Sequence, residues 1–244
     1  MSTCTDRPGL VIAGTGGPVA ESLAALARDR GWRVAHFVPA GARRSEHSAE
    51  ACVELDLAHS GEVEAAFAEL TEGWKRAPSA LVHFGFEPHG IASVTESASG
   101  WQAVQQGQVD AAFLFVQAGV REMLRLRGGS AVDDGSVVFV GDAFSNRAIP
   151  GMPMAGAGAA SAGLGGLVRQ LAVEWGPYGV RVNMVRAGAI EGDAPRPGHL
   201  VRRVPLGRAA TPEEIASACY YLISRSSSYV TGVALAADGG FLAT

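Results

Sequence analysis

The fold class is decided by the stretch Leu10-Val-Ile-Ala-Gly-Thr-Gly-Gly-Pro18 and by the segment Val19–Arg30 that follows it. The apolar residues that open the stretch predict a short buried strand, and the glycines after them predict a tight turn. Pro18 then starts a segment in which Leu23, Leu26 and Ala27 recur at helical spacing. A strand that leads through a glycine turn into a helix is the first half of a βαβ unit, which favours a parallel sheet.

The same alternation of short apolar runs and amphipathic segments continues to the end of the chain. We expect further strands at residues 33–38, 53–57, 80–84, 136–140, 180–185 and 233–237, and further helices at 61–74, 101–126, 157–175 and 211–224. Thr211 and Pro212 are residue types that favour an N-cap and a first helical position. This alternation predicts an α/β fold, a doubly wound parallel sheet of seven strands with helices on both faces.

The composition excludes several classes of protein. Of the 244 residues, 48% are hydrophobic and 18% are charged, which argues against a disordered chain. The apolar runs are far shorter than the roughly 20 residues that cross a bilayer. The net charge of −4 and the scattered positions of the 20 Lys and Arg residues argue against a nucleic-acid partner. No linker or change of composition divides residues 1–244, so we expect one domain with a loose tail over residues 1–8.

The cysteines indicate the redox environment. Cys4, Cys52 and Cys219 lie far apart and are odd in number, which argues against a disulfide framework and against a zinc site. We therefore expect no bound metal and a reducing, cytoplasmic location. The absence of a basic and apolar leader before Leu10 supports the same expectation.

The last third of the chain contains motifs that strongly resemble the short-chain dehydrogenases/reductases. These are Leu171-Ala-Val-Glu-Trp175, Pro177-Tyr-Gly-Val-Arg-Val-Asn183, Gly188-Ala-Ile190, Val204-Pro-Leu-Gly-Arg208, Thr211-Pro-Glu-Glu-Ile215, Tyr229-Val-Thr-Gly232 and Asp238-Gly-Gly240. The resemblance covers nearly the whole chain and implies a Rossmann-like sheet with a nucleotide crevice where the strand order reverses. It also implies a family of NAD(P)-dependent oxidoreductases and an assembly of two or four subunits built on two long helices.

The first turn departs from the family's Thr-Gly-x-x-x-Gly-x-Gly pattern. The matching residues run from Ala13 to Ala20, and only the first glycine, Gly14, stays in place. Pro18 has no N–H, so a donor to a pyrophosphate is lost at the start of the helix. The alternative is that Pro18 is only a favourable first helical residue. Gly14 and Gly16 remain as weak, vestigial candidates for cofactor contacts.

A second cofactor motif is also changed. Where the family has Asn-Asn-Ala-Gly after the fourth strand, this chain has His83-Phe-Gly-Phe86. The ring of Phe86 would then fill the cofactor crevice, or else it points into the core in a shifted turn.

The ends of the second and third strands are less informative. Val38 stands where NAD-using members hold an Asp for the ribose hydroxyls. Arg43 and Arg44 follow it, and they either hold a 2′-phosphate or are solvated. Asp56 matches the family's Asp at the adenine edge, but it would equally well cap a loop. We therefore expect no bound cofactor, with NADP as the less favoured alternative.

The catalytic pair of the family is missing. Aligning the glycine-rich helix on the family pattern places the Tyr-x-x-x-Lys pair at Ala157 and Ser161, or at Ala155 and Ala159 in the alternative register. No tyrosine lies between residues 101 and 177, so no shift of register restores the acid. The family's chemistry needs this phenol to move a proton at the carbonyl oxygen, with the lysine lowering its pKa. Ordinary hydride transfer is therefore not expected.

The other two catalytic positions are changed as well. Asp142, or in another register Ser145, stands at the place of the orienting serine, and Gln108 replaces the helix asparagine. Asp142 is the best candidate for new proton-transfer chemistry, although it would also serve as a helix cap. Further polar residues expected near the crevice are His83, Glu87, His89, Glu191 and Asp193.

Three functions follow from this pattern. The first is a non-catalytic subunit, or pseudoenzyme, that assembles with an active dehydrogenase of the same fold. The second is a repurposed enzyme of non-redox type, a dehydratase, isomerase or cyclase. The third is an atypical NADP-dependent oxidoreductase of ketones or alcohols. The first is favoured because residues 157–175 and 211–240 keep the family pattern best, and because the glycines of the first segment predict a close helix–helix contact between subunits. The partner would be a second copy or a paralogous subunit.

Overall fold

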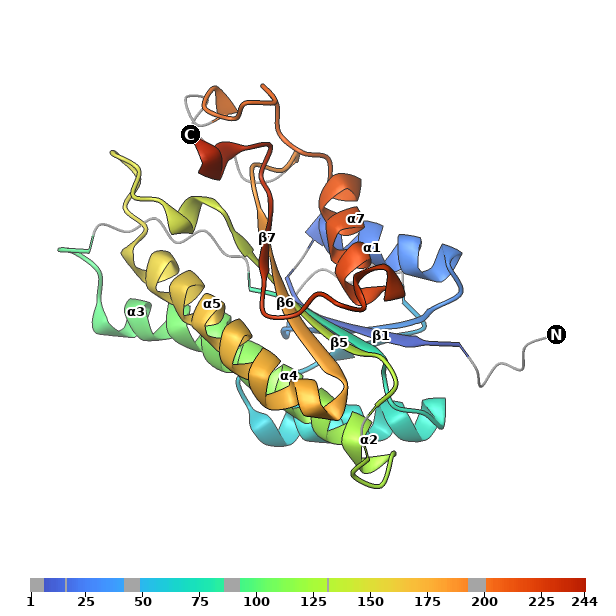
Figure 1. Ribbon diagram of the computed structural model, residues 1–244. Helices are drawn as coiled ribbons and strands as arrows, with labels where there is room; N and C mark the ends of the chain where they lie inside the picture. Colours follow the sequence, from blue (N-terminus) through green and yellow to red (C-terminus); the bar gives the residue numbers. More distant parts are fainter. Residues whose placement is uncertain (1–6, 16, 42–48, 86–92, 131, 193–200) are drawn as a thin grey trace.

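The computed structural model describes residues 7–15, 17–41, 49–85, 93–130, 132–192 and 201–244, which form a twisted sheet between two layers of helices (Figure 1). The strands are β1 (Gly9–Gly14), β2 (Arg33–Val38), β3 (Ala51–Glu54), β4 (Ala80–Phe84), β5 (Gly135–Asp142), β6 (Val180–Ala187) and β7 (Ala234–Ala237). They pair in parallel in the order β3-β2-β1-β4-β5-β6-β7. The predicted doubly wound sheet of seven strands is confirmed. Its order reverses between β1 and β4, and ligands bind at such a point beyond the carboxyl ends of the strands.

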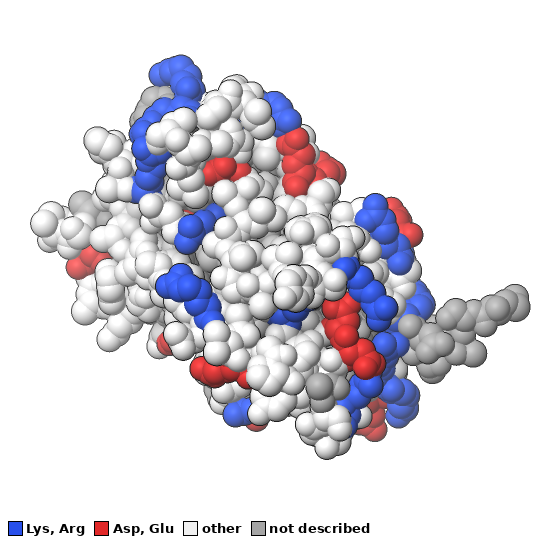
Figure 2. All heavy atoms as spheres, viewed as in Figure 1, with Lys and Arg blue, Asp and Glu red and all other residues white. Residues whose placement is uncertain are grey.

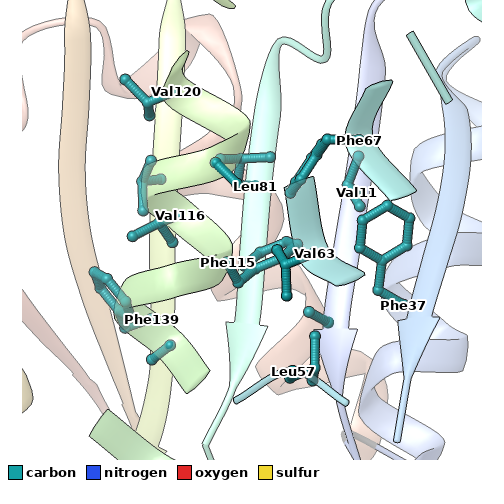
Figure 3. Packing of buried hydrophobic residues seen from close by; sticks show 14 of the residues in the cluster. Val11, Phe37, Leu57, Val63, Phe67, Leu81, Phe115, Val116, Val120 and Phe139 are labelled. Carbon is teal, nitrogen blue, oxygen red and sulfur yellow. The ribbon is translucent and has the colours of Figure 1, made fainter. Parts of the chain in front are cut away.

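Helices cover both faces of the sheet (Figure 1). α1 (Gly17–Asp29) and α7 (Pro212–Ile223) pack together on one face, and α2 (Ser60–Trp74), α4 (Ala111–Arg125) and α5 (Ala155–Trp175) cover the other. The second face holds the aromatic part of the core (Figure 3). There the ring of Phe67 lies 4.9 Å from that of Phe37 and 5.4 Å from that of Phe115, measured between centroids. Burial of these large rings joins β2, α2 and α4 into one packed layer.

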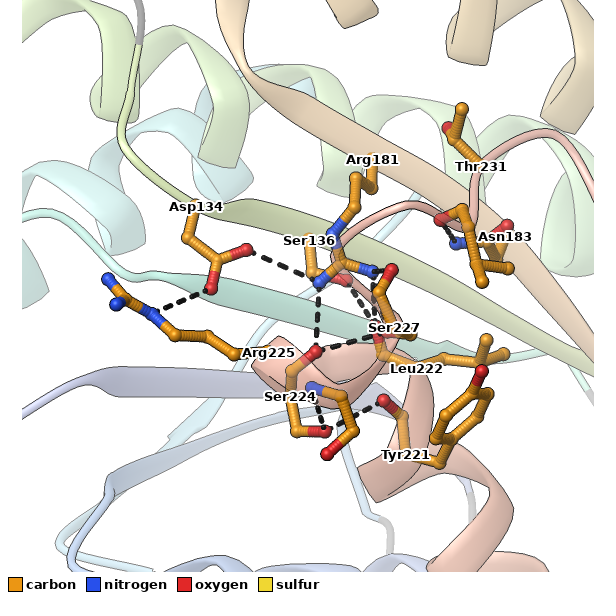
Figure 4. A network of polar contacts seen from close by, with 12 residues as sticks. Asp134, Ser136, Arg181, Asn183, Tyr221, Leu222, Ser224, Arg225, Ser227 and Thr231 are labelled. Atoms are coloured by element: carbon orange, nitrogen blue, oxygen red, sulfur yellow. Dashed lines mark hydrogen bonds and ion pairs between the residues drawn. The ribbon is translucent and has the colours of Figure 1, made fainter.

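Both ends of α7 are stabilised by side chains: a capping box at its start and the buried Arg181 at its end. Thr211 and Glu214 form the reciprocal capping box, with Pro212 in the first turn as predicted. At the other end, the Arg181 guanidinium donates to the carbonyl oxygens of Leu222 and Ser227 at 2.9 and 3.0 Å (Figure 4). A cation beside the last carbonyls of a helix is favourable. This network fixes α7 against the amino ends of β5 and β6.

The structure corrects two details of the sequence prediction. The helix expected at 101–126 begins earlier, as α3 (Ala98–Gln105), and reaches α4 through a π-helical turn over Gln106–Asp110. A π turn holds one extra residue, which an apolar repeat does not reveal. β3 ends before Leu55, because the chain turns at Asp56. Of the tail expected over residues 1–8, the structure describes Arg7 and Pro8, and the Arg7 guanidinium donates to the carbonyl oxygens of Gly31 and Trp32.

Candidate functional site

A cavity of about 450 Å³ lies where the strand order reverses. Its walls are the segments after β1, β2, β3 and β4, together with the helical stretch from Ala103 to Ala111. Its size is within the range of small-molecule sites, roughly 300–1,000 Å³. This is the crevice predicted for a nucleotide, and among the predicted site residues Gly14, Asp56, His83 and Gln108 line it.

Gly14 is required by the fold itself. Its φ of +95° is accessible to glycine, and a Cβ atom there would collide with the carbonyl oxygen of Phe84 on β4. The family glycine that survives is therefore the one that lets β1 and β4 approach. α1 begins at Gly17, and Pro18 is exposed in its first turn without an N–H to offer. Gly16 lies outside the described residues.

The ends of β2 and β3 provide few polar side chains that could contact a dinucleotide. Val38 is buried and apolar where a ribose-binding carboxylate would stand. Asp56 accepts a hydrogen bond from the backbone N–H of Ala58 at 2.9 Å, so its carboxylate has the loop-capping role, although it also lines the cavity. Several further candidates lie outside the described residues: Arg43, Arg44, Phe86, Glu87, His89 and Asp193.

His83 is the most unusual residue of the cavity wall. Its side chain is 1% exposed, and neither ring nitrogen has a hydrogen-bond partner in the described part of the chain. Burial lowers the pKa of His83 from 6.5 to about 4, so the imidazole is uncharged at neutral pH. From the sequence it was one of several crevice candidates. A histidine near the end of an apolar strand was the signal that could have singled it out.

The first predicted register places its two residues on the buried face of α5. Ala157 and Ser161 are buried, whereas Ala155 and Ala159 are exposed. The Nδ2 of Asn146 donates to the Ser161 hydroxyl at 3.1 Å and to the backbone carbonyl of Asp142 at 2.9 Å. The structure thus brings two of the four predicted positions together through Asn146, a residue that sequence reasoning missed.

The carboxylate of Asp142 has a local backbone contact. One of its oxygens accepts a hydrogen bond from the backbone N–H of Phe144 at 2.7 Å, two residues further along the chain, where the 3₁₀ turn Phe144–Asn146 begins. The contact is of the kind that the capping alternative predicts. Gln108 is buried in the π turn and lines the cavity, and Glu191 is exposed. Ser145, the other candidate for the orienting serine, is half-buried in the same 3₁₀ turn.

The two predicted catalytic positions on α5 carry different groups from those of the family pattern. Ala157 has no titratable group, and Ser161 has a hydroxyl in place of an ammonium group. The described residues also fit a dinucleotide poorly, since Pro18 lacks an N–H and Val38 lacks a polar group. No group of three potential metal ligands gathers among the described residues.

Comparison with known proteins identifies the relatives of the chain. The sequence family described as enoyl-(acyl carrier protein) reductase matches residues 16–242. The chain belongs to the short-chain dehydrogenase/reductase family. It is 32% identical over 197 residues to "Inactive 2-(S)-hydroxypropyl-CoM dehydrogenase 2" of Xanthobacter autotrophicus, covering 74% of this chain and 81% of that one.

One further sequence relative and one solved structure are also similar to this short-chain dehydrogenase/reductase. It is 34% identical over 150 residues to the 3-oxoacyl-[acyl-carrier-protein] reductase FabG of Chlamydia muridarum, a match that spans 59% of this chain and 57% of that protein. The structure of TT0495 protein from Thermus thermophilus superimposes with a TM-score of 0.83 at 30% identity, covering 98% and 100% of the two chains. In the described residues, no helix is long and apolar enough to cross a membrane.

Proposed function

We propose that this short-chain dehydrogenase/reductase is a non-catalytic subunit that assembles through α5, with a second copy or with an active paralogue. The observation that carries the proposal is the pair Ala157 and Ser161 on the buried face of α5. In the register predicted from the sequence, these two residues stand where the family has its tyrosine and lysine; alanine has no proton to donate, and serine brings no positive charge that would activate a neighbouring acid.

The outer face of α5 supports assembly. Small residues recur along it at helical spacing, with Ala159, Ala162 and Gly163 exposed and Gly166 half-buried, and Val173 continues the row with 76% of its surface exposed. Figure 2 shows that residues other than Lys, Arg, Asp and Glu predominate on the central part of the face that α5 and β7 present, although Lys and Arg side chains interrupt it. Small residues allow two helix backbones to approach closely.

The edge of the sheet supports the same proposal. In the part of the chain that the structure describes, β7 is an edge strand that pairs with β6, and an edge strand offers its outer backbone groups to a partner. Tyr229 is fully exposed and Val233 is 41% exposed close to this edge. A relative that is called inactive by name adds to the argument, because it resembles this chain over most of both sequences.

The test of assembly is to purify the protein from its native host and to determine the mass of the complex. We expect a dimer, a tetramer, or a complex that contains an intact paralogue. A monomer at tens of micromolar that captures no paralogue would rule the proposal out.

The proposal includes the absence of a functional dinucleotide site. We expect isothermal titration with NADH and NADPH to show no binding at micromolar concentration, because Pro18 and Val38 each remove a contact that the family pattern provides. A dissociation constant below about 10 μM, corresponding to roughly 7 kcal/mol, would contradict this expectation and favour an oxidoreductase.

A further inference from the structure

The flank of α5 that faces β7 carries two arginine side chains that converge on one point. A Cβ atom built on Gly165 would lie 3.5 Å from Nη2 of Arg186, which is on β6, and 4.0 Å from Nη1 of Arg169, which is one turn further along α5. Small neighbours leave room for the longer side chain, because Arg186 is paired in the sheet with Gly141 of β5 and with Ala236 of β7. Two guanidinium groups therefore lie close together at this flank.

The described part of the chain does not neutralise these two charges. Neither guanidinium forms a hydrogen bond or an ion pair there, whereas Arg208, also exposed, pairs with Glu214 at 2.7 Å. Arg169 is exposed and Arg186 is half-buried. The Nε of Arg186 is enclosed without a hydrogen-bond partner in the described residues, while its two terminal nitrogens are not enclosed. A carboxylate from outside would accept hydrogen bonds from the terminal nitrogens of both side chains.

The surroundings place this flank beside the proposed contact surface. Ala234 and Ala236 of β7 are exposed on the same side of the sheet as Arg186, and Arg169 borders the row of small residues that includes Gly166. Figure 2 shows Lys and Arg atoms within the central part of this face, with Asp and Glu atoms mainly toward its margins. A protein that packs closely on Gly166 also takes the nearby guanidinium groups out of water. Burying an unpaired charge is costly, so the covering surface must provide an acceptor.

A second copy of this chain does not provide that acceptor. In α5, β6 and β7, all of which lie within the described residues, the one acidic side chain is that of Glu174. Glu174 follows Arg169 by five residues and so points about 140° away from it around the helix. In the antiparallel packing that a two-fold axis across Gly166 gives, Glu174 of one copy lies opposite residue 158 of the other, about 16 Å along α5 from Arg169. Two copies would add further arginines to the contact and no carboxylate beside them.

We propose that the α5 face binds a different polypeptide, a paralogous subunit that places an aspartate or glutamate against Arg169 and Arg186, and not a second copy of this chain. The inference rests on the proposed function and selects between the two partners which that function leaves open. The arginines act as specificity residues. They favour a partner with a carboxylate at the facing position, and they disfavour the chain's own surface, which lacks one.

The experiment uses the family member that co-purifies with the full chain from its native host, identified by mass spectrometry and then produced separately. Its affinity for the wild-type chain is compared with its affinity for Arg169→Glu and Arg186→Gln, and we expect each variant to bind at least tenfold more weakly. Arg28→Glu is the control, because it changes the net charge as Arg169→Glu does but lies exposed on α1, on the other face of the sheet. It should leave the affinity unchanged. A change of the facing carboxylate residue of the family member to lysine should restore binding to Arg169→Glu.

The outcomes separate this inference from the proposed function. A wild-type chain that forms a stable homo-oligomer alone in light scattering, one that Gly166→Leu disrupts, would overturn the inference and leave assembly through α5 standing. A complex with the family member that neither Arg169→Glu nor Arg186→Gln weakens would do the same. A monomer at tens of micromolar that captures no family member would overturn the proposed function, and the inference with it.

Discussion

Replacing Gly166 by leucine tests the proposed α5 interface most directly. A Cβ atom at Gly166 would meet nothing within 4 Å, so the isolated chain has room for a larger side chain there. Leucine is also a much better helix former than glycine, by up to about 1 kcal/mol. Gly166→Leu should therefore leave the free energy of unfolding of a monomer unchanged or slightly higher.

The same substitution should strongly weaken the contact between subunits in an assembly. If another helix packs closely on this face, each added leucine overfills the contact at a cost of about 1–3 kcal/mol. In a two-fold symmetric dimer the cost arises twice, about 2–6 kcal/mol in total. The dissociation constant of the dimer should then rise roughly 30-fold to 10⁴-fold, since each 1.4 kcal/mol is a factor of ten.

The assay is size-exclusion chromatography with light scattering, together with thermal unfolding. Gly73→Leu is the matched control. It lies in α2, which α4 separates from α5, and a Cβ atom there also meets nothing within 4 Å (Figure 1). It should give the same gain in helix propensity and keep the assembly intact. A Gly166→Leu protein that assembles as the wild type does, or a wild type that is monomeric without a bound paralogue, would refute the reasoning.

Three further predictions concern the fold and the site. Gly14→Ala should lower the free energy of unfolding by at least about 2 kcal/mol in chemical denaturation, because its φ is positive and a Cβ atom would strike a backbone carbonyl; wild-type stability would contradict this. Burial lowers the pKa of both His36 and His83 to about 4, so the unfolded state takes up more protons as the pH falls below 6.5. Stability is therefore full above pH 6.5 and is lost toward pH 4, by about 3 kcal/mol between pH 7.5 and 5.5, and a double His→Phe variant should lose this pH dependence. Ala157→Tyr combined with Ser161→Lys should not create a reductase, and NADPH oxidation with a ketone substrate would show the crevice to be intact.

The sequence predicted the architecture well because burial on both faces of a parallel sheet leaves a strong pattern. The apolar runs mark six strands to within about two residues, and the third strand is the poorest match. Thr211 and Pro212 marked the start of α7 because capping is a local interaction between residues close in the chain.

The site could be predicted only in part because its contacts link distant segments. Asn146 joins Asp142 to Ser161 across 15 residues, and no local pattern signals such a bridge. The unsatisfied nitrogens of His83 depend on which side chains are missing around them, and sequence alone does not show this. For Asp142 the sequence left open catalysis or capping, and the structure adds one contact, in which a carboxylate oxygen accepts from the Phe144 N–H.

The pattern of kept and lost residues follows from how much packing each one supports. A Cβ atom on Gly188 would lie 2.7 Å from the Cα atom of Asp238, so this glycine is required for two chain segments to approach. Ala157 and Ser161 carry small side chains on a helix that keeps its core contacts through Leu164 and Val168. If these are the places of the family's tyrosine and lysine, as we propose, their replacement removes the family's proton transfer while the sheet and its helical layers stay intact. A chain in this state keeps the surfaces of the fold, and selection on a subunit contact would suffice to maintain it.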